Sequence, residues 1–200
     1  MHVMLDLETF GTKPGSVLRS IGAVAFDPRG SNSGATLYRN IDYVSCLEAG
    51  LTVDDVDLLH RFSIDLARYE DEPDAVTSTP QTLARDGFGA DPKFAALIAE
   101  RDGVPVGFAL YTFNYSVWTG ARGIFVEDIW VVPEARRGGV ARALMRALAQ
   151  ECARQGYKRI DLNVLDWNPA RGFYEKLGFR WIRNWLPYRL SGEALEKLAE

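Results

Sequence analysis

The stretch VVPEARRGGVARALM, residues 131–145, restricts the possible fold more than any other part of this 200-residue chain. An apolar strand stops at Pro133, a glycine pair follows, and an amphipathic helix begins at once. The first backbone N–H groups of such a helix have no partner within the helix, and the positive end of the helix dipole points outward. The stretch therefore predicts a strand–turn–helix unit that cradles an anion.

The residues of this turn suit a phosphate group. Gly138 and Gly139 let the backbone approach the anion closely, and Ala141 keeps the turn uncrowded. Three arginines add positive charge nearby: Arg136, Arg137 and Arg142. The alternative is an ordinary strand-to-helix turn with solvated arginines, because glycine-rich turns are common in proteins.

Hydrophobic periodicity predicts strands and helices on both sides of the turn, and an apolar fraction of 47% is enough for a core. Strands are expected at 2–7, 17–26, 35–42, 95–101, 106–114, 123–132, 159–165, 179–183 and 186–190. Helices are expected over DVDLLHRFSIDLARYE, around 81–85, from the glycine pair to Gly156, over 170–177, and after a capping Ser191.

Charge and cysteine content narrow the function classes. A net charge of −4 carries no electrostatic signal for nucleic acid, so no nucleic-acid partner is expected. Cys46 and Cys152 lack the spacing of metal ligands and are expected to be reduced thiols of a cytoplasmic protein. The chain shows no signal-peptide pattern and no run of about 18 apolar residues, so no membrane association is expected.

Several motifs together resemble one enzyme family. RRGGVA resembles the Arg-x-x-Gly-x-Gly/Ala pyrophosphate loop of the Gcn5-related N-acetyltransferases (GNAT family), and DWNPARGFYEKLGF resembles their second hallmark. LARYE, DGFGADP, VGFALYTFNYSVWTG, IFVEDIWV and YRLSGEALEKLA resemble the diamine (spermidine/spermine-type) subgroup. The resemblance covers about 54–200 and implies an α/β (α+β) acyl-CoA N-acyltransferase fold, whose mixed central sheet has two strands that splay apart.

The resemblance implies acetyl-CoA as the acetyl donor, lying between the splayed strands that end at Val132 and Leu165. Its pantetheine would pair with the backbone of one strand, and its pyrophosphate would sit on the glycine turn. The implied cofactor-binding residues are Ile129, Trp130, Val131, Arg136, Arg137, Gly138, Gly139, Val140, Ala141, Arg142, Asn168 and Ala170. Asn168 and Tyr174 are six residues apart, whereas many relatives have seven, which makes the Asn168 contact less secure.

Amine acetylation requires proton transfers, and two residues are candidates for them. An alkylamine has a pKa near about 10.4, so at neutral pH a base must free its lone pair. Glu127 interrupts an apolar strand and is implied to be that base, directly or through water; the alternative is an ion pair with an arginine at a strand bulge. Tyr174 is implied to be the general acid that protonates the CoA thiolate; the alternative is packing against Phe173.

The expected substrate is the primary amine of a small cationic molecule. Acidic groups along a slot favour a linear diamine or polyamine, while thialysine-like and other amino-acid side-chain amines stay open. The loop YEDEPD could equally be a solvated loop, as runs of charge usually are. The implied substrate-binding residues are Tyr69, Glu70, Glu127, Asp128, Asp161 and Asn163. By analogy with relatives, a homodimer is expected.

The first 53 residues resemble a different family. VMLDLETFGTKPG, SIGAVAFDP and LYRNIDYVSCLEAGLTVD resemble the start of a DnaQ-like 3′–5′ exonuclease of the ribonuclease H fold. Asp6 and Glu8 would be its first metal ligands, but the further carboxylates of a two-metal site are missing, so no metal is expected. We expect a non-catalytic β-meander whose segment Leu37–Ser45 replaces the edge strand of an acetyltransferase domain at 54–200. A metal-dependent nuclease and a non-catalytic CoA-binding module are the alternative functions.

Overall fold

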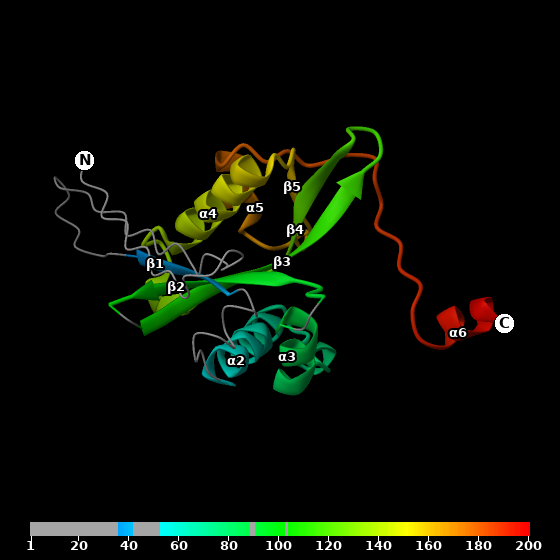
Figure 1. The fold of residues 1–200 in the computed structure, drawn as a ribbon, viewed down its shortest axis with the longest axis horizontal. Coiled ribbons are helices and arrows are strands. Elements are labelled where there is room, and N and C mark those ends of the chain that lie inside the picture. The colour runs from blue at the N-terminus through cyan, green and yellow to red at the C-terminus, as the bar shows by residue number, and fades with distance from the viewer. Residues whose placement is uncertain (1–35, 42–52, 89–90, 103) are drawn as a thin grey trace, which may run out of the picture. The chain divides into compact units, whose positions relative to one another are not determined.

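The computed structural model describes residues 36–41, 53–88, 91–102 and 104–200. The chain divides into two compact units, Met1–Asn163 and Val164–Glu200. The first unit contains a five-stranded sheet in the spatial order β1-β2-β3-β4-β5 (Figure 1). Its strands are β1 (Thr36–Ile41), β2 (Ala95–Arg101), β3 (Val104–Ser116), β4 (Ala121–Val131) and β5 (Ile160–Leu162). Neighbours from β1 to β4 are antiparallel and β5 is parallel to β4, which confirms the mixed sheet.

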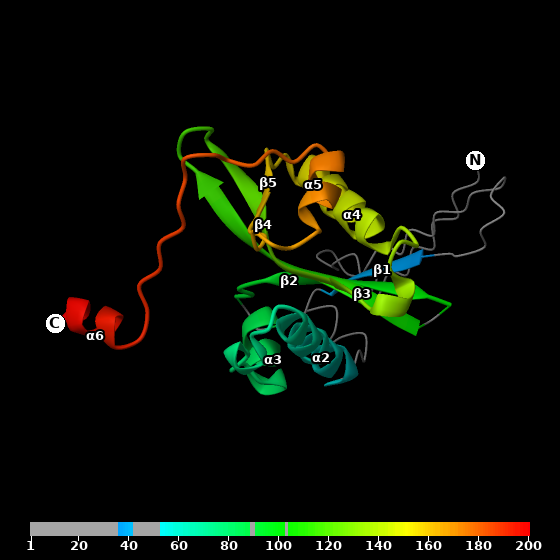
Figure 2. The same ribbon diagram turned by 180° about the vertical axis from the view of Figure 1, so that it is seen from behind.

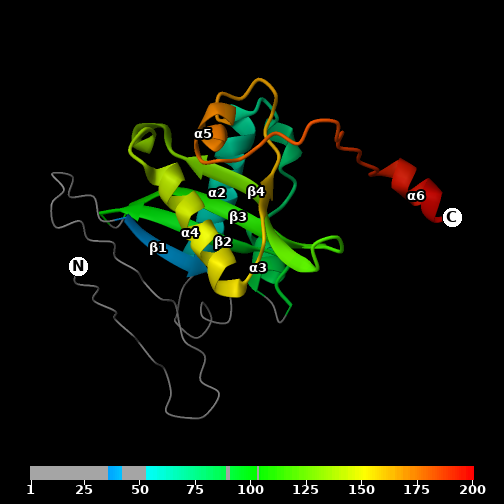
Figure 3. The same cartoon turned by 90° about the horizontal axis from the view of Figure 1, so that it is seen from above.

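Helices cover both faces of this sheet. The helices α2 (Val53–Tyr69) and α3 (Pro80–Phe88) lie on one face and α4 (Val140–Gln155) on the other (Figures 1 and 2). Figure 3 shows α4 running across the strands. Two single turns of 3₁₀ helix, η1 (Pro73–Ala75) and η2 (Pro133–Ala135), follow α2 and β4 respectively. This two-sided layering gives every central strand a buried position.

The core on the α2 face explains why α2 is a helix. Leu58, Leu59 and Phe62 recur at helical spacing and pack against the sheet. Leu59 is fully buried, and the ring of Phe62 stacks on Phe108 with centroids 5.7 Å apart. Each such side chain stabilises the fold by about 1.5–3 kcal/mol through burial. The remaining buried members of this cluster are Ala96, Ile98, Leu110 and Trp130.

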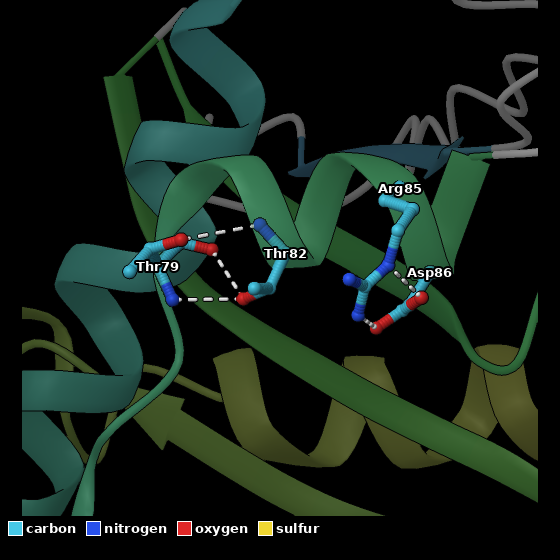
Figure 4. Close-up of polar contacts among 4 residues, drawn as sticks. All are labelled: Thr79, Thr82, Arg85 and Asp86. Atoms are coloured by element: carbon cyan, nitrogen blue, oxygen red, sulfur yellow. Dashed lines mark hydrogen bonds and ion pairs between the residues drawn. The ribbon is translucent and has the colours of Figure 1, made fainter.

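Helix α3 begins at a reciprocal pair of threonines. The backbone N–H of Thr82 donates to Oγ1 of Thr79 at 3.2 Å, and the N–H of Thr79 donates to Oγ1 of Thr82 at 2.8 Å (Figure 4). Pro80 occupies the first helical position, where no N–H is needed. Near its end, Arg85 and Asp86 form an exposed ion pair, which solvent screens. These local contacts extend the helix beyond the expected 81–85.

The edge strand expected from the N-terminal part is present. All six residues of β1 pair antiparallel with β2, from Thr36↔Arg101 to Ile41↔Ala96. The sheet is therefore completed by a segment that sequence analysis assigned to the exonuclease-like part. Residues 42–45 of the expected strand lie outside the described residues, as do the expected strands at 2–7 and 17–26.

The second unit contains α5 (Arg171–Lys176) and α6 (Glu193–Ala199). The strands expected at 179–183 and 186–190 are wrong, since residues 177–192 of this unit form no strand. Alternating apolar residues indicate a strand only when another strand supplies hydrogen bonds, and that partner is not a property of local sequence. The expected Ser191 cap is also wrong: Gly192 is the N-cap, and no side chain caps α6.

Candidate functional site

The glycine turn has the backbone geometry that the sequence predicted. Gly139 is the N-cap of α4 with φ 86°, and Arg137 has φ 61°, both in the left-handed region. Among the described residues no side chain caps the N-terminus of α4. Its first N–H groups are therefore available to an external acceptor, such as a phosphate oxygen. The helix ends at Gly156 with φ 70°, as expected.

We expect Gly139→Ala to destabilise the protein by about 1–2 kcal/mol. A Cβ at Gly139 would meet nothing within 4 Å, so the cost arises from its left-handed backbone and not from a clash. Gly172 in α5 is a matched control, because its Cβ would also meet open space but its backbone is helical. Thermal denaturation should show a lower melting temperature for Gly139→Ala and an equal or higher one for Gly172→Ala. Equal melting temperatures for Gly139→Ala and wild type would contradict this assignment of strain.

β4 and β5, the two strands that the resemblance implied would splay apart, pair over a short register. β5 pairs with β4 only from Ile124↔Ile160 to Val126↔Leu162. β4 continues to Val131, so the edge of residues 127–131 that faces away from β3 has no strand partner among the described residues. The expected strand at 159–165 is shorter: β5 comprises only the residues that pair with β4, because a strand requires a hydrogen-bonding neighbour. This free backbone edge includes the three residues predicted to pair with pantetheine.

Glu127 lies at a β-bulge on this free edge. Leu110 pairs with Asp128 and Tyr111 pairs with Val126, which leaves Glu127 without an opposing residue on β3. Its carboxylate is exposed and accepts a hydrogen bond from Oγ1 of Thr112 at 2.8 Å. The bulge is the one considered as a structural alternative, but among described residues the partner is a hydroxyl and not an arginine. The role of Glu127 as base stays a prediction.

Asp128 is the half-buried acid of the site. It faces α2, where Oγ of Ser63 donates a long hydrogen bond of 3.5 Å to its Oδ2. Burial raises the pKa of Asp128 to about 6, and the negative charges of Glu127 and Glu70 add to the effect. Burial also raises the pKa of Glu70. The negative charge of Asp128 is therefore opposed both by its burial and by the charges of Glu127 and Glu70, and a cation beside Asp128 would relieve that cost.

An arginine stack connects the acids to the glycine turn. The rings of Tyr69 and Trp130 lie 5.7 Å apart, and the guanidinium of Arg136 is 5.0 Å from the first and 4.6 Å from the second. Nε of Arg136 donates to the backbone carbonyl of Val131 at 3.0 Å. Each cation–π contact contributes about 0.5–1 kcal/mol at such a partly exposed position. The stack brings Tyr69, predicted to contact the amine, to the end of β4.

Two residues that were predicted to bind the substrate, Asp161 and Asn163, differ from Asp128 in their contacts or exposure. Oδ2 of Asp161 forms an ion pair with Nε of Arg159 at 2.8 Å and accepts a hydrogen bond from Nδ2 of Asn114 at 3.1 Å. Its charge is thus already compensated, so it attracts an ammonium group less than Asp128 does. Asn163 is exposed. Contacts of both residues with a substrate stay predictions.

The remaining predicted residues lie in the second unit. Oδ1 of Asn168 accepts a hydrogen bond from the backbone N–H of Ala170 at 2.9 Å, which fixes the start of α5. Tyr174 is buried, with its ring 5.3 Å from Phe173 and 5.8 Å from Phe179. The packing contact considered as an alternative is therefore present, and it orients the ring without excluding a role for the hydroxyl. The roles of Asn168, Ala170 and Tyr174 stay predictions.

Sequence reasoning missed the two hydroxyls that contact the acids. Ser63 stands seven residues before Glu70, the residue that follows α2, so helical periodicity extended by one residue places both on one side and offered a usable signal. Thr112 offered none, because its contact with Glu127 depends on the strand register at the bulge.

Within the described residues, no three or more His, Cys, Asp or Glu side chains form a group suited to a metal ion. No helix in that same portion is long and apolar enough to cross a membrane.

Comparison with known families divides the chain within α2. Residues 60–179 match the family model described as acetyltransferase (GNAT) family, and residues 1–59 match the 3′-5′ exoribonuclease Rv2179c-like domain. Thialysine N-epsilon-acetyltransferase of Sus scrofa is 40% identical over 147 residues, which is 68% of this chain and 86% of the relative. L-ornithine N5-acetyltransferase NATA1 of Arabidopsis thaliana is 35% identical over 98 residues, which is 48% of this chain and 43% of the relative.

Solved structures share the fold. An integron cassette protein from the mobile metagenome of V. cholerae superposes with a TM-score of 0.64 at 26% identity, covering 82% of this chain and 98% of that one. A ribosomal-protein-alanine N-acetyltransferase from Brucella melitensis biovar Abortus 2308 superposes with a TM-score of 0.57 at 21% identity, covering 79% and 99%. These likenesses confirm the α/β acyltransferase fold expected from the sequence.

Proposed function

Because the chain belongs to the acetyltransferase (GNAT) family, we propose that it transfers the acetyl group of acetyl-CoA to a primary amine of a small cationic substrate. The observation that carries this proposal is the half-buried Asp128, held beside Glu70 and Glu127 on the unpaired part of β4. A cationic amine beside Asp128 relieves the cost of its buried charge, so it is the ligand class that the site favours.

The residues present fit acetyl-CoA. The uncapped amides of α4 are donors for the diphosphate, and the free backbone edge at residues 129–131 can pair with the pantetheine amides. Arg137 and Arg142 are exposed beside the same turn. When bound there, acetyl-CoA supplies a thioester carbonyl that a neutral amine attacks.

Asp128 holds the substrate ammonium and is the better proton acceptor. An alkylammonium has a pKa near about 10.4, so proton transfer to a carboxylate is uphill. Transfer to a group with a pKa of about 6 is less uphill, by about 3 kcal/mol, than transfer to an ordinary aspartate. Glu127, the base that the sequence suggested, is exposed and contributes negative charge on the same strand.

Backbone and tyrosine complete the proposed chemistry. A backbone N–H on the free edge of β4 donates to the carbonyl oxygen of the thioester as negative charge develops on it. Tyr174 then gives its hydroxyl proton to the departing thiolate sulfur. The acetyl–sulfur bond breaks and the acetyl–nitrogen bond forms. The ammonium loses two protons: the first passes to a carboxylate before attack and is later released to solvent, and the second leaves nitrogen after attack and restores the Tyr174 hydroxyl through solvent.

The substrate class is a linear molecule with a terminal amine. Relatives are named for thialysine, ornithine and spermidine/spermine, all of which carry such a group. Glu70 offers a second negative site for a diamine. Asp6 and Glu8, the candidates for a nuclease centre, lie outside the described residues, and the relatives named above, all acetyltransferases, do not favour the nuclease alternative. A homodimer and a cytoplasmic location stay predictions.

The test is an assay of free CoA thiol with putrescine, spermidine, ornithine and thialysine as acceptors. We expect turnover with at least one amine, and Tyr174→Phe should lower kcat by about 10²-fold with little effect on CoA affinity. Tyr115→Phe is the control, because Tyr115 is exposed on β3. No thiol release with any amine, together with measurable CoA binding, would identify a non-catalytic CoA-binding module instead.

A further inference from the structure

We propose that Arg101, at the end of β2, binds the diphosphate of CoA from outside the glycine motif. This proposal rests on the proposed use of acetyl-CoA. It assigns diphosphate binding to a residue of β2, whereas the glycine motif lies between β4 and α4. Its basis is a contact between two segments that are far apart in the sequence.

The hairpin of β2 and β3 extends alongside the glycine turn. Gly107 of β3 pairs with Val131, and the N–H of Val132 donates to the carbonyl of Val106 at 3.0 Å. Arg101 pairs with Val104 at the tip of this hairpin, beyond the last residue of β4. The strand register therefore carries the tip of the hairpin to the segment that follows β4.

The guanidinium of Arg101 lies directly against Gly138. A Cβ built on Gly138 would be 2.6 Å from Nη2 of Arg101 and 3.5 Å from its Cζ. The missing side chain of Gly138 thus makes room for an arginine as well as for a ligand. The cation stands at the turn before α4, where the free amides begin.

In the part of the chain that the structure describes, the arginines around this turn have no carboxylate partner to balance their charge. Arg68, Arg85, Arg154 and Arg159 each form an ion pair. Within the described residues, none of the four at the turn does so: Arg101, Arg136, Arg137 and Arg142. Uncompensated cations that converge on one loop repel one another, and a dianionic ligand removes that cost. A diphosphate has the charge and the acceptor oxygens to do so.

Calorimetric titration of the full chain with CoA and with 3′-dephospho-CoA tests the proposal. We expect Arg101→Ala to weaken both ligands equally, by about 10-fold, because a charge-assisted hydrogen bond to a phosphate is lost. Arg101→Lys should retain part of the affinity. Arg122→Ala is the matched control, since Arg122 is exposed near the start of β4 and opposite Tyr115. Circular dichroism should show the same melting temperature for the Arg101 variants and wild type.

Gly138→Ala supplies a second, independent readout. Its methyl group would displace the Arg101 guanidinium, so the loss of CoA affinity should be smaller in the Arg101→Ala background than in wild type. Additive losses, or an unchanged affinity in Arg101→Ala, would overturn the proposal. A loss seen with CoA but not with 3′-dephospho-CoA would overturn the diphosphate assignment. No binding of CoA by wild type would overturn the proposed function, and this assignment with it.

Discussion

Deleting residues 1–41 is expected to leave a chain that no longer folds, even though the acetyltransferase match begins at residue 60. The deletion removes β1, which pairs with β2 along six residues and contacts α4. Loss of these backbone hydrogen bonds, at about 1 kcal/mol net each, approaches the whole stability of an ordinary domain. It also exposes the edge of an apolar strand, residues 95–101, which favours aggregation.

The matched control is deletion of residues 1–35, which keeps β1. Size-exclusion chromatography and thermal denaturation should show a soluble, cooperative protein for this shorter deletion and aggregated protein for the longer one. If the protein lacking residues 1–41 were as stable as full-length protein, β1 would contribute nothing to the sheet. The exonuclease-like segment would then be only an appendage of the enzyme.

Asp128→Asn is expected to make the protein more stable at pH 8 and much less active. Burial raises the pKa of Asp128 to about 6 in the folded state, above an ordinary value of 3.8. Because this pKa is higher in the folded state than in the unfolded state, the folded protein binds the Asp128 proton more tightly, and the bound proton stabilises the fold. This stabilisation is complete below about pH 4 and is lost as pH rises through about 6. The full loss corresponds to about 3 kcal/mol at pH 8, and the neutral asparagine avoids most of it.

The same substitution removes the group that holds and deprotonates the ammonium. We expect kcat/KM to fall by about 10³-fold with the best amine, while CoA affinity is unchanged. In wild type the acidic limb of the kcat/KM profile should lie near pH 6, because protonated Asp128 neither attracts nor deprotonates the amine. Chemical denaturation from pH 4 to 8 and steady-state kinetics over the same range measure both effects.

Glu127→Gln is the comparison that assigns the base. Glu127 is exposed and hydrogen-bonded to Thr112, so its loss should cost less activity than the loss of Asp128. If Glu127→Gln abolished turnover while Asp128→Asn retained it, the assignment of the base would revert to Glu127. If Asp128→Asn were no more stable at pH 8 than wild type, the strain attributed to its burial would be absent.

Local sequence by itself determined those helices and turns that depend on residues close together in the chain. The apolar spacing of Leu58, Leu59 and Phe62 requires a helix, and the left-handed glycines Gly139 and Gly156 mark the two ends of α4. The strand–turn–helix unit, the acetyltransferase motifs and the acids at residues 127 and 128 were all identifiable in this way. Each depends on backbone preferences and side-chain periodicity within a few residues of the chain.

Only the tertiary structure decided which of these groups meet. The pairing of β1 with β2, the end of β5 at Leu162 and the bulge at Glu127 depend on strand register, which joins residues far apart in sequence. Register also brings Arg101 to Gly138. The strands expected after residue 178 failed for the same reason, since a strand needs a partner that its own residues do not specify. Local preferences therefore determined the elements, and long-range hydrogen bonding and burial determined the site.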